Sequence, residues 1–257
     1  ADAELMTRAQ IEAQNAELFA VDDSMFDLRA LPATLDGATV RGWIEGLSSR
    51  PERTRYDVEG KAVPAETLDA LMSNLAVDSI PAPQPTRFGL VVHRAALRSF
   101  PTGLRVFSSA GDTDIDRFQE SALFPGTPVV VTHASGDGQW LFVVSPRYAA
   151  WIEADAVATG DKAAVFGYVD AAPYRIITGD KVDTVFTREA PRVSELQLDM
   201  GVRVPVLADW PAGKPVNGQD GYTSYVIELP VRNDDGSLRF APALLPRREP
   251  SQDHYLP

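Results

Sequence analysis

The sequence predicts an α+β multidomain chain, in which a small N-terminal helical region precedes two small β-barrels. Apolar residues recur at helical spacing up to about residue 80, whereas short β-branched and aromatic runs separated by turn residues follow residue 87. Two stretches of the β region also share one pattern, which indicates a repeated barrel. A chain of 257 residues has room for one large domain or for two to three small ones.

The composition excludes several classes of function. The formal net charge is −12 and no basic stripe is present, so binding to nucleic acid is not expected. No run of 18 apolar residues occurs, and no membrane-spanning helix is predicted. The sequence contains no cysteine, which excludes disulfides, cysteine metal ligands and a cysteine nucleophile within these residues. No cofactor is predicted.

Three helices are predicted before residue 80. Residues 2–20 are good helix formers with a thin apolar face, so this helix is expected to lie on a surface. The second helix follows possible capping residues at 36–39, and Pro64 begins the third. Both carry one apolar face that we expect to pack inward. These faces consist of Val40, Trp43, Ile44 and Leu47, and of Leu68, Leu71, Met72 and Leu75.

Residues 80–85 contain three prolines in alternation, which favours an extended, semi-rigid connector. Beyond it, residues 88–92 are predicted to form a strand and residues 98–107 a strand bent at Pro101. The strongest signal is a hairpin, because the apolar residues 129–132 and 140–144 flank a turn that contains Asp137 and Gly138.

The internal repeat relates residues 104–146 to residues 182–230. Each copy places a Phe-containing strand first, then a Val-rich strand, a Gly/Asp turn and a second apolar strand that ends in Pro. The second copy has a longer hairpin loop at residues 211–221. Two copies about 80 residues apart predict two barrels that each close their own edges. Residues 244–257 are rich in Pro and Arg and are predicted to be a connector.

Metal binding is not predicted. Asp112, Asp114 and Asp116 alternate, but the spacing to Glu120 does not fit a calcium loop, so a solvated turn-forming loop is expected. His93 and the other strand histidine, His133, have no converging ligands nearby in sequence and are predicted to be structural.

Several short segments carry a resemblance to a known family. They resemble the first bacterial SH3-like domain of NlpC-type cell-wall cysteine peptidases, and Met25, Phe26 and Leu28 lie in a stretch similar to the first segment of that family's helical clip domain. The resemblance covers nearly all of residues 20–257 and is most specific in the first barrel. The matching segments there are residues 98–102, 116–121, 126–129, 135–140 and 148–151.

The resemblance implies an order of domains. It implies a helical clip domain at residues 1–80, SH3-like barrels at 87–160 and 161–246, and a linker at 247–257 toward a papain-like catalytic domain. That domain cuts γ-D-glutamyl–diamino-acid bonds in peptidoglycan stem peptides with a Cys nucleophile and a His base. This chain lacks the cysteine, so by itself it is expected to be inactive. The implied partners are a stem peptide or muropeptide and the catalytic domain in cis, in the periplasm or cell envelope.

Four residues of the first barrel are predicted to bind substrate. Trp140, Tyr148 and Trp151 either fill the barrel or form the wall of a glycopeptide groove. The resemblance implies that this domain shapes the substrate cleft, where Asp116 or Asp137 would meet a free stem-peptide amine. The predicted site is therefore Asp116, Asp137, Trp140 and Tyr148. One departure is that two alanines at 149 and 150 replace the family's glycine-containing pattern before Trp151.

Two alternatives remain open at this point. The chain could be a standalone module that binds peptidoglycan or another protein. It could also be a scaffold whose barrels only pack on each other, in which case replacing Trp140 would cost stability without affecting binding.

Overall fold

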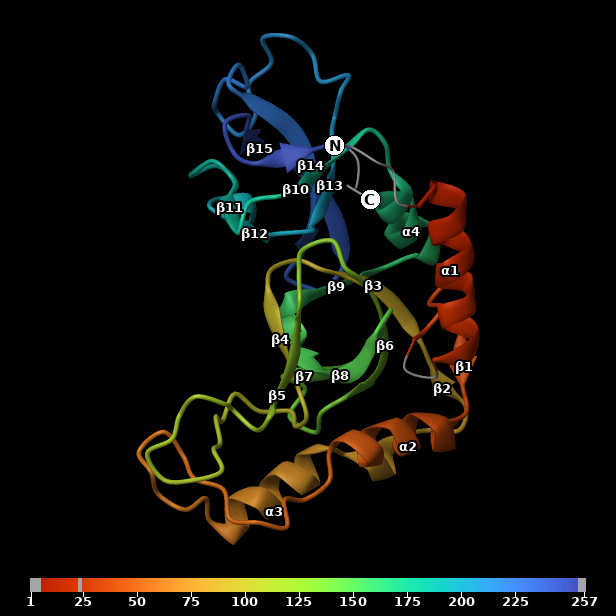
Figure 1. The fold of residues 1–257 in the computed structure, drawn as a ribbon, viewed down its shortest axis with the longest axis vertical. Helices are drawn as coiled ribbons and strands as arrows, with labels where there is room; N and C mark the ends of the chain where they lie inside the picture. The colour runs from red at the N-terminus through yellow and green to blue at the C-terminus, as the bar shows by residue number, and fades with distance from the viewer. Residues whose placement is uncertain (1–5, 23–24, 254–257) are drawn as a thin grey trace.

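The computed structural model describes residues 6–22 and 25–253. In Figure 1 the second β unit lies at the top, the first barrel in the middle, and helices α2 and α3 at the bottom, while α1 runs along the right side. This arrangement confirms the predicted α+β class with a small helical region and SH3-like barrels. Within the described residues, no helix is both long enough and apolar enough to cross a membrane.

The predicted helices are present. Helix α1 (Arg8–Val21) begins after Thr7, whose side chain forms a capping box with Gln10, and the predicted residues 2–5 lie outside the described part. Asp36 caps α2 (Gly37–Leu47) by accepting a hydrogen bond from the Ala38 amide. Pro64 immediately precedes α3 (Ala65–Asn74).

The proline-rich stretch is tied to the helical region rather than only leading away from it. Strand β1 (Thr34–Leu35) pairs with β2 (Gln84–Pro85), and Ile80 is buried in a cluster shared by the helices and the first barrel. The helical region therefore packs directly on the barrel that follows it.

Seven strands of the described chain form the first barrel, in the order β5-β4-β8-β7-β6-β3-β9. The predicted hairpin is confirmed as β6 and β7, with a positive φ of 70° at Gly138 in the turn. Ala150 is fully buried in regular pairing with Val143, so this strand adopts its path without a glycine. The strands are β3 (Arg87–Val91), β4 (Ala95–Arg98), β5 (Gln119–Leu123), β6 (Pro128–Ala134), β7 (Trp140–Ser145), β8 (Tyr148–Glu153) and β9 (Val157–Gly160).

The predicted bent strand over residues 98–107 is wrong. Strand β4 ends at Arg98, and the next strand begins at Gln119. The Arg98 side chain instead donates to the Leu104 carbonyl at 2.5 Å and to Asp116 at 2.8 Å. These side-chain bonds order residues 99–118 as an irregular loop, which pairs with the loop after α2 through Phe107 and Tyr56. Pro101 in this loop also lacks an amide for a strand ladder.

The first barrel has apolar residues on both surfaces of its sheet. Its interior cluster includes Leu97, Val143 and Ile152. On its outer surface Phe142 and the fully buried Trp151 pack with the inward faces of α2 and α3. The apolar faces predicted for these two helices therefore do pack inward.

Helix α4 (Lys162–Asp170) joins the two barrels and was not predicted. Tyr168 stacks on Phe240 of the second barrel with ring centroids 5.4 Å apart and donates to the Glu228 carbonyl at 3.3 Å. On its other side α4 contacts Leu90 and Phe88 of β3, so it lies between both barrels.

Within residues 161–253, the part of this region that the structure describes, the second barrel is built from three smaller sheets around one cluster that includes Val204, Ile227 and Leu229. The loop at residues 211–221 precedes β14, and Val206 bridges to Ile227 across its base. Part of the predicted terminal connector is strand, because residues 244–246 belong to β15 and β16 pairs with β10. The strands are β10 (Tyr174–Ile177), β11 (Lys181–Asp183), β12 (Gln197–Asp199), β13 (Arg203–Pro205), β14 (Ser224–Arg232), β15 (Leu238–Pro246) and β16 (Ser251–Gln252).

Candidate functional site

Asp116 lies in a buried ion pair. Its carboxylate accepts from Arg98 at 2.8 Å and from the amides of Val106 and Phe118 at 3.1 and 3.0 Å. The Asp116 and Arg98 side chains are only 9% and 6% exposed. The expectation of a solvated loop is therefore wrong for this aspartate, whose carboxylate orders the loop from within.

Trp140 is 7% exposed and packs in the cluster between the helices and the first barrel. Its neighbour in that cluster, Trp151, donates its indole N–H to the Ser48 hydroxyl at 3.1 Å, and Ser48 donates in turn to the Ser99 carbonyl at 2.6 Å. Both rings are thus buried between two units, on the outer surface of the first barrel. The sequence interpretation that they fill the barrel is therefore right about their burial and wrong about their place.

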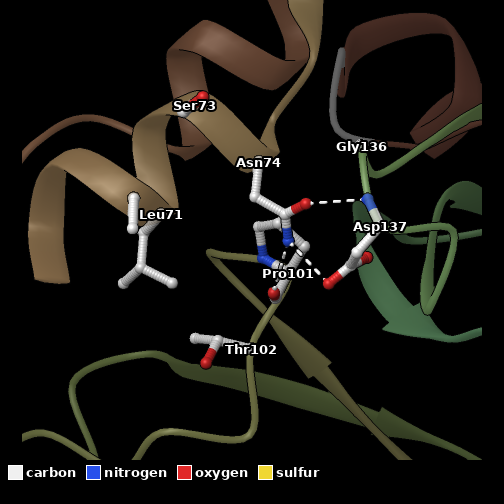
Figure 2. A pocket seen from close by; sticks show the side chains of 8 residues that line it. Leu71, Ser73, Asn74, Pro101, Thr102, Gly136 and Asp137 are labelled. Atoms are coloured by element: carbon white, nitrogen blue, oxygen red, sulfur yellow. Dashed lines mark hydrogen bonds between the residues drawn. The ribbon is translucent and has the colours of Figure 1, made fainter.

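Asp137 lines an open hollow of about 560 Å³ between α3 and the β6–β7 turn. Figure 2 shows its exchange of hydrogen bonds with Asn74, whose side-chain amide donates to Asp137 at 3.1 Å and accepts from the Asp137 amide at 3.0 Å. Burial acts to raise the pKa of Asp137, but hydrogen bonds from Ser135, Gln139 and Asn74 outweigh it and keep that pKa below its ordinary value. The charged carboxylate therefore joins the helical region to the hairpin.

Tyr148 stands at the start of β8, and its hydroxyl donates to the Glu120 carboxylate. Burial and the nearby Glu120 charge raise the pKa of Tyr148 to about 12, so the hydroxyl stays protonated at neutral pH. Tyr148 is half-buried and Glu120 is exposed. Of the four predicted residues, Tyr148 brings a polar group to an exposed carboxylate.

Glu120 opens onto a pocket of about 410 Å³ that sequence reasoning missed. The pocket lies between the loop after α2 and the loop before β5, over a floor of Phe100 and Phe118. Its charged lining consists of Arg50, Glu52, Arg53, Arg55, Arg117 and Glu120. Arg55 and Arg117 lie 62 positions apart in sequence, so no local motif signals this pocket.

The structure does not bring the four predicted residues into one site. Tyr148 belongs with Glu120 at the arginine-lined pocket, Asp137 lies in the hollow beside α3, and Asp116 and Trp140 are buried. Within the described residues, no group of three or more His, Asp or Glu side chains is placed to hold a metal ion. The ring of His133 donates to the Leu75 carbonyl at 2.9 Å, which gives this histidine a structural contact.

Comparison with known protein families identifies one segment of the first barrel. Residues 105–153 match the SH3 domain family of the SH3b1 type. This SH3b1-type segment contains the β6–β7 hairpin and all four residues of the predicted site. No curated protein sequence matches the chain.

A solved structure is similar over almost the whole chain. It is an NlpC/P60 endopeptidase from Photobacterium damselae subsp. piscicida, with a TM-score of 0.72 and 17% sequence identity. The alignment covers 98% of this chain and 54% of that protein, so the chain spans about half its length. At this identity the likeness shows a shared fold, and together with the SH3b1-type segment it confirms the resemblance predicted from the sequence.

Proposed function

We propose that this chain is the non-catalytic, cleft-shaping and targeting region of a bacterial peptidoglycan stem-peptide hydrolase. The Cys/His catalysis would lie in a further domain, reached from residues 247–257, and the protein would work in the periplasm or cell envelope. The shared fold and the SH3b1-type segment support the general role. In this proposal the three units keep the bounds expected from the sequence, 1–80, 87–160 and 161–246, with β16 added to the second barrel because it pairs with β10.

The observation that carries the proposal is the exposed Glu120 carboxylate held by Tyr148. One Glu120 oxygen accepts the tyrosine hydroxyl, which leaves the other oxygen free to accept from a cationic group. A stem peptide freed from its glycan has an N-terminal ammonium group of this kind. We propose that Glu120 and Tyr148 bind that amine at the mouth of the pocket, by a charge-assisted hydrogen bond.

The other predicted residues support the pocket instead of touching the peptide in this proposal. Asp116 orders the loop that carries Arg117 and leads into β5, where Glu120 lies, and Trp140 packs beneath the helical region. Asp137 fixes the hairpin to α3. Each therefore acts on binding through the position of its neighbours.

The test is binding of the tripeptide L-Ala-γ-D-Glu-meso-diaminopimelate to the whole chain, measured by calorimetry. We expect binding without cleavage, and about tenfold weaker binding for Glu120→Gln. Tyr148→Phe should weaken binding less, and Glu153→Gln, an exposed glutamate at the end of β8, is the matched control. Equal affinity for the N-acetylated tripeptide would contradict amine recognition, and cleavage by this chain would contradict a non-catalytic role.

A standalone wall-binding module is the second candidate, and the second barrel supplies the observation that favours it. Tyr222 is 86% exposed beside Trp210 and Tyr225 in a hollow of about 360 Å³. Aromatic rings with polar edges suit sugar faces. Retention of the isolated chain on purified peptidoglycan, lost in Tyr222→Ala but kept in Glu120→Gln, would favour this function.

A further inference from the structure

Four arginines line the pocket beside Glu120, and three of them have no side-chain partner among the described residues. Arg53 and Arg55 come from the loop after α2, and Arg117 comes from the loop before β5. Within the part of the chain that the structure describes, the side chains of these three make no hydrogen bond or ion pair. Arg50, at the same pocket, is paired with Asp69 and with the Ala65 carbonyl.

This concentration of positive charge is unusual for the chain. The formal net charge is −12, yet four arginines and only two glutamates line the pocket. Like charges that share a pocket repel each other, and the repulsion increases where protein replaces water. Arg50 is paired with Asp69 outside the lining, so Glu52 and Glu120 face three unpaired guanidinium groups. The pocket therefore favours an anion that the chain itself does not supply.

The backbone beneath these arginines is held in place. The Arg55 carbonyl accepts from the Val63 amide at 2.8 Å, and the Arg117 amide donates to the Val106 carbonyl at 2.7 Å. Between them, Tyr56 and Phe107 exchange backbone hydrogen bonds of 3.0 and 2.8 Å. The two loops are thus joined to each other. This fixes the backbone positions from which the arginine side chains extend, and so lowers the entropy lost when they bind a ligand.

We propose that Arg53, Arg55 and Arg117 form a binding site for carboxylate groups. A guanidinium group offers paired N–H donors that match the two oxygens of a carboxylate. The volume of about 410 Å³ is within the range of small-ligand sites. That the carboxylates belong to a stem peptide rests on the proposed function, in which Glu120 binds the amine of the same peptide while the arginines bind its acidic groups.

The experiment measures binding to the whole chain by NMR titration, with glutarate, inorganic phosphate and the tripeptide as separate probes. Glutarate presents carboxylates alone, so it tests the arginine site independently of stem-peptide recognition. We expect glutarate to shift the side-chain signals of Arg55 and Arg117. Replacing Arg53, Arg55 and Arg117 together by Ala should weaken glutarate and tripeptide binding by about tenfold or more.

The matched control replaces three other exposed arginines, Arg87, Arg188 and Arg239, by Ala. It therefore removes the same amount of positive charge from a different part of the surface. This control should bind both probes as the unaltered chain does. Arg117→Ala alone provides a second variant, since Arg117 is exposed and its removal leaves the backbone contacts in place. Amide spectra of each variant report whether the fold is retained.

The possible outcomes separate the two proposals. If both triple variants weakened glutarate binding equally, or if phosphate bound as tightly as glutarate, the proposal of a carboxylate site would be overturned. Tripeptide binding lost in Glu120→Gln but kept in the pocket triple variant would also overturn it, while leaving the proposed function intact. Glutarate binding that depends on the pocket arginines, without tripeptide binding, would support the carboxylate site and contradict the proposed function.

Discussion

The two barrels bury their apolar residues in different ways. The first has an interior cluster and a second cluster on its outer surface, where Phe142 and Trp151 meet the inward faces of α2 and α3. The second has one interior cluster and contacts the rest of the molecule mainly through α4 and the ends of β14 and β15. A small barrel can thus be completed from inside alone, or can share its core with a neighbour.

This difference has a consequence for folding and for function. Because the outer cluster contains residues from both units, the helical region and the first barrel should unfold together. The arginine-lined pocket lies at this same junction, between the loop after α2 and the loop before β5. The shape of this pocket on the first barrel therefore depends on the helical region, whereas we expect the second barrel to keep its fold without that region.

The largest effect is expected from Trp140→Ala, which removes a ring that is 7% exposed from the shared cluster. We expect a loss of about 3–5 kcal/mol in the free energy of unfolding. Hydrogen exchange should show that the helical region and first barrel open together while the second barrel stays protected. Leu229→Ala is the corresponding substitution in the core of the second barrel. If hydrogen exchange showed loss of protection throughout the chain in both variants, the difference described between the two barrels would be wrong.

The next largest loss of stability is expected from Asp116→Ala, because the substitution leaves Arg98 charged and buried without its partner. Breaking a buried pair costs about 3 kcal/mol or more, and the Arg117 loop should become more mobile. Its counterpart in the second barrel is Asp234→Ala, which removes an exposed pair with Arg192 and should cost at most about 1 kcal/mol. Chemical denaturation measures both, and equal costs would contradict the assignment of Asp116 to the buried framework.

Ser48→Ala tests the polar contact within the shared cluster. The substitution removes the hydroxyl that joins the Trp151 indole to the Ser99 carbonyl, and leaves both groups unsatisfied in a buried place. We expect a loss of about 2 kcal/mol in thermal or chemical unfolding. Ser48→Thr, which retains a hydroxyl, is the control; a neutral Ser48→Ala would show that water replaces the lost bonds.

The smallest effect concerns pH and the His133 ring between β6 and α3. Burial lowers the pKa of His133 from its ordinary value of 6.5, partly offset by its hydrogen bond to Leu75, and nearby Arg41 lowers it further. The unfolded chain therefore takes up a proton first as the pH falls below 6.5, so this contribution to stability is full above that pH and declines below it.

Denaturant unfolding between pH 8 and pH 5 measures this dependence, with the pH values chosen to span the ordinary histidine pKa. His133→Gln keeps an N–H donor toward Leu75 and should reduce the pH slope. An unchanged slope in His133→Gln would exclude this histidine as its source.

Local sequence patterns were sufficient to predict several helices and strands. Helical spacing predicted the inward faces of α2 and α3, and the turn residues Asp137 and Gly138 predicted the β6–β7 hairpin, because these signals act between near neighbours in sequence. Helix α4 escaped prediction since its nine residues form a helix mainly through packing between the barrels. The resemblance supplied the SH3-like fold, which periodicity alone could not.

The candidate site was predicted less well than the fold. The sequence identified Tyr148 as a candidate but gave no partner for it, and it offered Asp116 and Asp137 as binding groups although both are engaged within the protein. Glu120 and Arg117 both lie within residues 116–121, a segment already noted for its resemblance, yet nothing local in the sequence joined them to Arg55.

The sequence by itself determined the helical faces, the main hairpin, the acidic balance and the absence of a cysteine nucleophile. Only the tertiary structure decided which charged groups are buried, that the first barrel shares its core with the helices, and that distant arginines line one pocket. The physical reason is that periodicity reports which face of an element is apolar, whereas burial and electrostatic partnership depend on what another element brings to that face.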